Sequence, residues 1–223
     1  MEKIYELIEK AEIYKYEGKL SRAIKQYYEI LKIKKDYIPA LMNLGNLHYV
    51  FGQMKKSVEK YQKVGKLKPN YCFAFYRLGI AQYRAAHFKN AIETFKKIDK
   101  EKTELYMAYS WMGLCYYHIG NEEKSVECYI KLLEKTPETS IINYHLAIAS
   151  KARGEYNGAI ENLNLLLEEN PEHVSACFHL GICYMRKYDT DKALELFKKV
   201  LKLDPKHKAA SEYFETITNY PPI

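Results

Sequence analysis

The sequence predicts an all-α protein, a solenoid of six helix-turn-helix repeats followed by a capping helix. The main observation is that the same residue classes recur every 34 residues. Each repeat also contains two amphipathic segments with helical spacing of apolar residues. Only 10 Gly and 7 Pro occur among 223 residues, whereas an all-β fold needs many tight turns. A hydrophobic content of 48% is sufficient for a core.

Four rows of equivalent positions define the register. The eighth position holds a small residue: Gly45, Gly79, Gly113, Ala147 and Gly181. The twentieth position is also small: Ala23, Ser57, Ala91, Ser125, Ala159 and Ala193. The twenty-fourth position is large and apolar: Tyr27, Tyr61, Phe95, Tyr129, Leu163 and Phe197. Proline recurs near the end of the repeat: Pro69, Pro137, Pro171 and Pro205. The predicted repeats are therefore 4–37, 38–71, 72–105, 106–139, 140–173 and 174–207.

Each row has a structural reason. The first helix covers about positions 1–14 of a repeat and the second about positions 17–30, with a turn between them that often contains glycine. Small residues let the paired helices approach closely, and the large residue at the twenty-fourth position is expected to fill the gap between neighbouring repeats. Proline ends the second helix because it cannot continue it. After the repeats, 208–218 reads as a capping helix, and 219–223 as an extended tail.

The rows resemble the tetratricopeptide repeat signature, W-x2-L-G-x2-Y, then A-x3-F, then P, with a period of 34. The match is best in 174–207, where the signature residues are Leu180, Gly181, Tyr184, Ala193, Phe197 and Pro205. The third repeat departs from it, with Thr103 at the proline position. The resemblance implies a single domain over 4–207, wound as a right-handed superhelix whose first helices line a concave surface.

On that concave surface we expect positions 2, 5, 9, 12 and 13 of the first helices, opposite the core face. Tyr49, Tyr83 and Tyr117 occupy one equivalent position, and the same interpretation places Met42 and Ser110 beside the groove. The candidate partner-binding residues are Asn46, Tyr49, Phe73, Tyr76, Ile80, Tyr83, Arg84, Trp111, Leu114, Tyr117, Tyr144 and Lys151. They predict a non-catalytic scaffold that binds an apolar peptide or helix, with some acidic residues, from a partner protein.

Other interpretations of this groove remain open or are disfavoured. The same side chains could pack on each other or on a second copy of the chain. The carboxylate clamp with which some family members hold chaperone tails is disfavoured. Asn43 and Arg77 match it, but Ile8, Glu12 and Phe73 do not.

The charge distribution suggests a second class of function. Residues 1–100 carry 21 Lys/Arg against 10 Asp/Glu, whereas the rest of the chain has a net charge of −4. The lysines lie largely on the second helices of the first two repeats, which the resemblance places on the convex face. Binding of nucleic acid or an anionic surface there is the less favoured alternative. Self-assembly, for example through Tyr220-Pro-Pro-Ile, is a third.

Catalysis, cofactors and metals find no support in the sequence. No nucleotide-binding, nucleophile-elbow or zinc-protease motif occurs. His145 and His179 lie near Cys177 and Cys183, but their spacing fits no metal motif. The 5 cysteines are odd in number and contain no CxxC pair, which favours a reducing compartment. Because the start of the chain is charged and no long apolar run follows, we expect a cytoplasmic protein without a membrane span.

Overall fold

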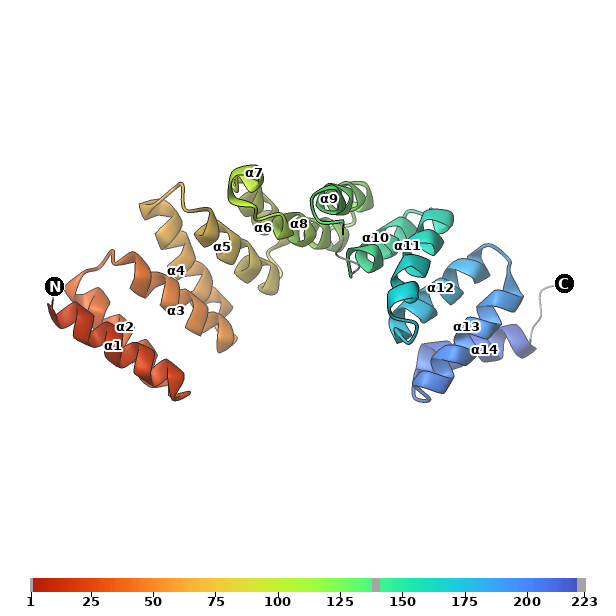
Figure 1. Ribbon diagram of the computed structural model, residues 1–223, viewed down its shortest axis with the longest axis horizontal. Coiled ribbons are helices and arrows are strands. Elements are labelled where there is room, and N and C mark those ends of the chain that lie inside the picture. The colour runs from red at the N-terminus through yellow and green to blue at the C-terminus, as the bar shows by residue number, and fades with distance from the viewer. Residues whose placement is uncertain (1, 138–140, 220–223) are drawn as a thin grey trace. The chain divides into compact units, whose positions relative to one another are not determined.

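A computed structural model describes residues 2–137 and 141–219, with the side chain of Lys102 left out. The described residues are mostly helical and contain no β-strand (Figure 1). The helices are α1 (Glu2–Tyr16), α2 (Leu20–Ile33), α3 (Ile38–Val50), α4 (Met54–Leu67), α5 (Cys72–Arg84), α6 (Phe88–Lys96), α7 (Lys100–Thr103), α8 (Met107–His118), α9 (Glu122–Lys135), α10 (Ile141–Ala152), α11 (Tyr156–Glu169), α12 (Val174–Arg186), α13 (Thr190–Leu203) and α14 (Lys208–Asn219). This is the predicted all-α repeat architecture.

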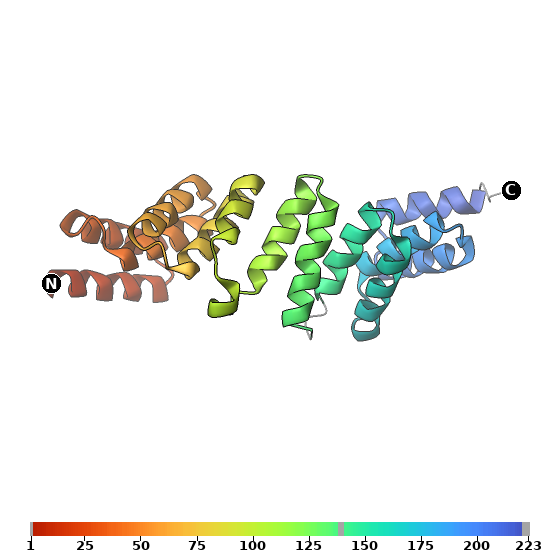
Figure 2. The same cartoon turned by 90° about the horizontal axis from the view of Figure 1, so that it is seen from above.

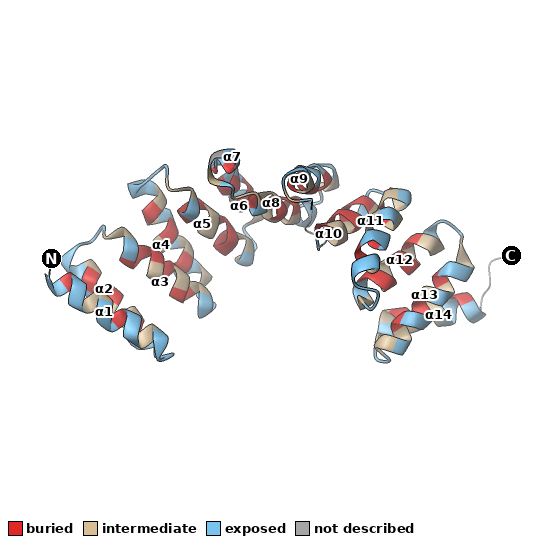
Figure 3. Ribbon diagram, in the orientation of Figure 1, coloured by how far each residue is buried: buried red, intermediate tan, exposed pale blue. Residues whose placement is uncertain are grey.

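The chain divides into two compact units. Unit 1 extends to Cys115 and unit 2 begins at Tyr116, so that the division falls within α8. In unit 1, each helix from α1 to α6 packs against the next, and in unit 2 the same holds from α9 to α14. Figure 2 shows the paired helices of each repeat from above. Buried residues form stripes along the helices (Figure 3), as expected for amphipathic helices packed on one side.

The recurring spacing of glycine and aromatic residues along the chain is explained by direct contact within a repeat. A Cβ atom added to Gly45 would lie 2.5 Å from Cε1 of Tyr61. The same substitution at Gly79 would place a Cβ atom 2.5 Å from the Phe95 ring. Such distances are far below van der Waals contact, so the eighth position must be small wherever the twenty-fourth is aromatic.

The turn inside each repeat requires a left-handed backbone. The four glycines at its fifteenth position have φ near +70° to +80°. The equivalent residues of the third and sixth repeats, Ala86 and Tyr188, adopt the same conformation with φ of 58° and 63°. Side chains with a Cβ atom rarely adopt this region. The turn geometry is therefore imposed by helix packing even where glycine is absent.

The third repeat departs from the others after its second helix. The helix α6 has 9 residues, whereas α4 has 14. The ammonium group of Lys100 donates hydrogen bonds to the carbonyl oxygens of Phe95 and Ile98, at 3.0 and 3.2 Å. A cation at this place satisfies carbonyl groups that have no partner within the helix. The early end of α6 is thus stabilised by a side chain of α7, the helix that follows it.

At the C-terminal end, α14 covers the last repeat. Ala210 and Ile217 are buried against Phe197 and Val200 of α13. The ring of Tyr213 stacks on Phe197 with centroids 5.4 Å apart. A helix therefore occupies the region where a cap is predicted, although it includes Asn219. The remainder of the predicted tail, residues 220–223, lies outside the described residues.

Candidate functional site

Most of the predicted partner-binding residues of unit 1 have accessible side chains. We call this set the aromatic face. It comprises Asn46, Tyr49, Phe73, Tyr76, Tyr83, Arg84, Trp111 and Leu114. Phe73 and Arg84 are exposed, and the others are half-buried. The residues come from the first helices α3, α5 and α8. Half-buried rings of this kind are fixed at one edge and accessible at the other.

The ring of Trp111 contacts two other rings of the aromatic face, those of Tyr76 and Tyr83. The indole Nε1 of Trp111 donates a hydrogen bond to the hydroxyl of Tyr76 over 3.3 Å. The rings of Tyr83 and Trp111 meet edge to face, with centroids 5.2 Å apart. Burial raises the pKa of Tyr83 above its ordinary value, so its hydroxyl stays neutral at physiological pH. The single tryptophan is therefore held between residues of α5 and forms part of a rigid apolar surface.

Two guanidinium groups lie beside Tyr49. The Cζ atoms of Arg77 and Arg84 are 5.3 and 5.8 Å from the centroid of the Tyr49 ring. Nε of Arg77 also donates to the hydroxyl of Tyr61 over 3.4 Å. Neither arginine forms an ion pair with a described carboxylate. These cation–π contacts leave guanidinium N–H groups available to an anionic group.

Three residues predicted to face the groove are instead buried. Ile80, Met42 and Ser110 are only 6%, 7% and 8% exposed. Ile80 occupies the ninth position, where Asn46 contacts the large residue of its own repeat. Burial at this position is specific to the third repeat, since Leu114, Ile148 and Ile182 at the ninth position of other repeats are half-buried. Met42 and Ser110 occupy the fifth position, from which the longer side chain of Tyr76 does reach the surface.

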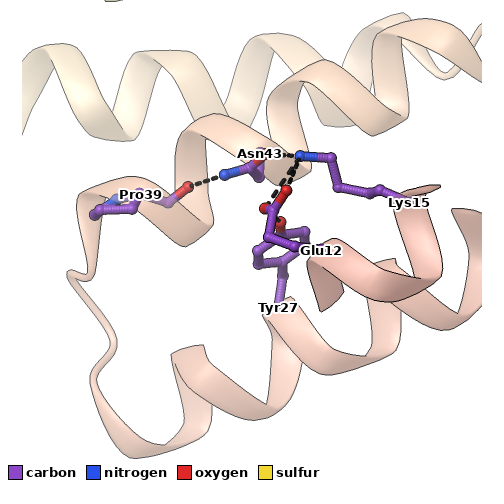
Figure 4. A network of polar contacts seen from close by, with 5 residues as sticks. All are labelled: Glu12, Lys15, Tyr27, Pro39 and Asn43. Atoms are coloured by element: carbon purple, nitrogen blue, oxygen red, sulfur yellow. Dashed lines mark hydrogen bonds and ion pairs between the residues drawn. The ribbon is translucent and has the colours of Figure 1, made fainter. Parts of the chain in front are cut away.

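Polar side chains of the first repeat are hydrogen-bonded to each other and to Asn43 of the second repeat (Figure 4). Nζ of Lys15 lies 2.8 Å from Oε2 of Glu12 and donates to Oδ1 of Asn43 over 3.1 Å. The hydroxyl of Tyr27 donates to Glu12 over 2.5 Å. Asn43 in turn donates to the carbonyl oxygen of Pro39. Asn43, which matches the carboxylate clamp in sequence, is therefore already engaged with groups of its own chain.

Unit 2 contains a separate cluster of aromatic and basic side chains. Tyr117 is 38% exposed, whereas Tyr144 and Lys151 are half-buried. The ring of Tyr144 lies 5.4 Å from that of His173 and 5.9 Å from that of His179. Nζ of Lys151 is 3.0 Å from Nδ1 of His179. Since an ammonium group only donates, Nδ1 must accept and the proton of neutral His179 resides on Nε2.

His179 and the nearby Cys183 are kept neutral by their surroundings. Burial, the charge of Lys151 and the charge of His207 lower the pKa of His179 to about 4. Burial raises the pKa of Cys183 to about 11, which makes its thiol a poor nucleophile. In the described part of the chain, no three His, Cys, Asp or Glu residues are arranged to hold a metal ion.

Sequence reasoning missed Arg77 as a neighbour of the candidate residues. In the sequence, Arg77 is notable only because it matches one position of the carboxylate clamp. The contact of Arg77 with Tyr49 depends on the separation of α3 and α5, which the register alone does not provide. Within the described residues, no helix is both long and apolar enough to cross a membrane.

Comparison with family models gives three matches, each described as a tetratricopeptide repeat. They cover residues 73–101, 108–139 and 151–212, together more than half of the chain. A search of curated proteins found no match.

Solved structures with similar folds include MamA, with 22% identity and a TM-score of 0.68 over 83% of this chain and 96% of that one. YrrB, described as a TPR protein with an unusual peptide-binding site, has 18% identity and a TM-score of 0.71 over 83% and 96%. A tetratricopeptide repeat protein from Parabacteroides merdae has 17% identity and a TM-score of 0.75 over 98% and 100%. At these identities the similarity establishes the fold.

Proposed function

Because the chain belongs to the tetratricopeptide repeat family, we propose that it is a non-catalytic scaffold that binds another protein. The ligand is an apolar peptide or helix of the partner, held in an aromatic-rich concave groove. In unit 1 the contact surface is the aromatic face. Tyr117, Tyr144 and Lys151 are the corresponding candidates in unit 2.

The observation that carries this proposal is the contact between Tyr83 and Trp111, with Trp111 also bonded to Tyr76. Large rings that are fixed before binding lose little conformational entropy when a ligand arrives. Tyrosine and tryptophan are also the side chains that most often dominate binding energy at protein interfaces. The family relationship supports this proposal, as does the similarity of the fold to that of YrrB, the protein described as having a peptide-binding site.

The arginines beside Tyr49 suggest the chemistry of the partner. Arg77 and Arg84 lack a carboxylate partner among the described residues, and both lie against the same ring. An acidic side chain next to an apolar anchor would pair with them by charge-assisted hydrogen bonds. We therefore expect the bound segment to be apolar with at least one Asp or Glu.

The test compares two double variants in affinity capture followed by mass spectrometry. Tyr49→Ala with Tyr83→Ala removes two rings of the aromatic face. The matched control is Tyr5→Ala with Tyr16→Ala, two exposed tyrosines on α1. Proteins captured by the wild type and by the control should be lost with the first variant, while both variants keep the wild-type circular dichroism. Capture that is unchanged by the loss of Tyr49 and Tyr83 would disprove the proposed surface.

Binding of nucleic acid or an anionic surface by the lysines of the first two repeats remains the alternative. Several of these lysines are paired within the chain, including Lys19 with Glu17, Lys32 with Glu29 and Lys63 with Asp36. Pairing lowers the charge available to phosphates. Salt distinguishes the two modes, since binding to phosphates weakens steeply as salt increases, whereas binding to the aromatic face does not.

A further inference from the structure

A second surface of unit 1 contains a cavity of about 840 Å³ between α4, α5 and α6. Its apolar wall is formed by Gly65, Phe75 and Leu78, and lysines Lys66, Lys89 and Lys97 also line it. None of the residues that line this cavity belongs to the aromatic face. The cavity is therefore a separate feature of the same unit.

The sequence beside this cavity departs from the repeat pattern at Gly65. Gly65 occupies the twenty-eighth position, which is leucine in four of the other repeats: Leu31, Leu133, Leu167 and Leu201. Leu31 packs on the core of the first repeat, and Leu167 and Leu201 pack on cores in unit 2. Gly65 provides no such side chain. The Phe75 ring takes this place instead: a Cβ atom at Gly65 would lie 3.0 Å from its Cε1 atom, so α4 contacts the following repeat through Phe75.

The short α6 enlarges the same opening. The helix ends at Lys96, where the second helices of other repeats continue for another turn. The residues that would form that turn begin with Lys97. They are not part of α6, and Lys100 instead donates hydrogen bonds to the carbonyl oxygens at its end.

The cavity and the aromatic face lie on different sides of α5. Phe75, Leu78 and Gln82 line the cavity and are spaced by three and four residues, which places them on one side of the helix. Tyr76 and Tyr83 belong to the aromatic face and project from α5 at an angle of about 100° or more from that side. A ligand in the cavity therefore need not compete with a ligand on the aromatic face.

The charge around the cavity is positive and unbalanced. Among the described residues, Lys66, Lys89 and Lys97 form no ion pair. The acidic residue at the cavity, Glu93, is paired with Lys96 over 2.9 Å. The ammonium group of Lys97 lies 5.9 Å from the centre of the Phe75 ring. Apolar and cationic groups therefore meet at one edge of the cavity.

We propose that this cavity binds an acidic segment of a partner protein, with one apolar side chain inserted against Phe75 and Leu78. Carboxylates on either side of that anchor pair with Lys66, Lys89 and Lys97. Charge complementarity selects the acidic segment, because three unpaired lysines would repel a basic ligand. Phe75 and Leu78 are only 9% and 5% exposed, so the anchor covers a small apolar area and the charge pairing supplies most of the selectivity.

The probe is a display library of 12-residue peptides with one central Leu, Ile or Phe among Glu and Asp residues. Binders are measured against the full chain by fluorescence polarisation. Asn90→Trp fills the mouth of the cavity from an exposed position on α6. The triple change Lys66→Glu, Lys89→Glu and Lys97→Glu reverses its charge. The matched control reverses three exposed lysines of α13: Lys198, Lys199 and Lys202.

We expect Asn90→Trp and the triple change each to weaken binding at least about tenfold, as lost complementarity raises the dissociation rate. The α13 control and the Tyr49→Ala with Tyr83→Ala variant should stay within about twofold of the wild type, since distant sites act independently. The proposal is wrong if no library peptide binds, or if the α13 control weakens binding equally. It is also wrong if laurate binds the cavity and the selected peptides do not displace it.

Discussion

The hydroxyl group of Tyr61 donates a 2.5 Å hydrogen bond to Oδ1 of Asn46. The first repeat contains the same pair of positions, where Tyr27 donates to Glu12. The other tyrosine of this row, Tyr129, stacks on His145. The remaining three repeats have Phe or Leu at the twenty-fourth position and isoleucine at the ninth: Ile80 with Phe95, Ile148 with Leu163, and Ile182 with Phe197. The ninth residue is therefore polar in the two repeats where it accepts a hydrogen bond from the tyrosine hydroxyl.

This hydrogen bond predicts that a substitution at Asn46 lowers stability and that a second substitution at Tyr61 restores it. Asn46→Leu leaves the largely buried hydroxyl of Tyr61 without its acceptor, which should lower the free energy of unfolding by about 1–3 kcal/mol. Adding Tyr61→Phe reproduces the apolar pairing of Ile80 with Phe95 and should restore most of the loss. Urea unfolding followed by circular dichroism measures both. If the two substitutions prove simply additive, the hydrogen bond does not couple these positions.

The fold was predictable because the constraint is local and repeated. Gly45 with Tyr61 and Gly79 with Phe95 make the same contact at the same spacing, so that the register alone indicates the helix pairs. Exposure was less predictable. Tyr76 and Ser110 share the fifth position, but only the long ring reaches the surface. The cavity was missed because its lining depends on how side chains of α4, α5 and α6 meet in space, which the register alone does not provide.

The fifteenth position offers a test of backbone strain. Ala86 and Tyr188 have positive φ where four other repeats have glycine. Ala86→Gly and Tyr188→Gly should each raise the free energy of unfolding by about 1 kcal/mol, because glycine adopts this region without a steric penalty. Thermal or urea unfolding provides the measurement.

Gly52→Ala is the matched control for these variants. A Cβ atom at Gly52 would meet nothing within 4 Å, so only the backbone conformation is affected. This variant should lower the free energy of unfolding by a similar amount, about 1 kcal/mol. A neutral result at all three positions would mean that the turns accommodate any residue.

Trp111 provides an intrinsic probe of the aromatic face. Its indole is half-buried and lies against Tyr83. Tyr83→Ala should expose the ring to water and shift its emission to longer wavelength. Binding of an apolar partner should shift it to shorter wavelength. Because this is the single tryptophan of the chain, fluorescence excited at wavelengths beyond the tyrosine absorption band reports on it alone.

Tyr16→Ala serves as the control for the fluorescence experiment, since Tyr16 is 95% exposed on α1. Its emission spectrum should match that of the wild type. An unchanged spectrum with Tyr83→Ala would contradict the contact between Tyr83 and Trp111.

The network around Glu12 predicts acid sensitivity in the first repeat. Burial acts to raise the pKa of Glu12, but hydrogen bonds from Lys15 and Tyr27 and the charge of Lys15 outweigh it, so the pKa is lowered. A carboxylate with a lowered folded pKa stabilises the protein above its unfolded pKa, and this contribution is lost as the pH falls through the folded value. Stability should therefore decline on acidification below about pH 4.5, the ordinary value.

Glu12→Gln removes this titration and keeps a hydrogen-bond acceptor for Tyr27. The variant should be less stable than the wild type at pH 7, and the difference should narrow towards pH 3. Melting temperatures measured over this range provide the comparison. A constant difference at every pH would show that the charge of Glu12 contributes nothing.

The lowered pKa of His179 predicts that the stability of unit 2 depends on pH in a higher pH range than that of Glu12. Its pKa is lowered from 6.5 to about 4, first by burial and then by the charges of Lys151 and His207. Between these two values the unfolded chain binds a proton that folded His179 does not, so stability falls as the pH decreases from 6.5 towards 4 and is unaffected above 6.5.

Lys151→Met isolates the contribution of the ammonium group. It removes the cation 3.0 Å from Nδ1 while keeping an unbranched side chain, so the pKa of His179 should rise towards its ordinary value. Titration of the imidazole Cε1 proton by NMR measures this shift directly, and His118, exposed in α8, gives an internal reference. If the His179 resonance titrates identically in both proteins, burial and the charge of His207 set its pKa, and the lysine contact has no electrostatic effect.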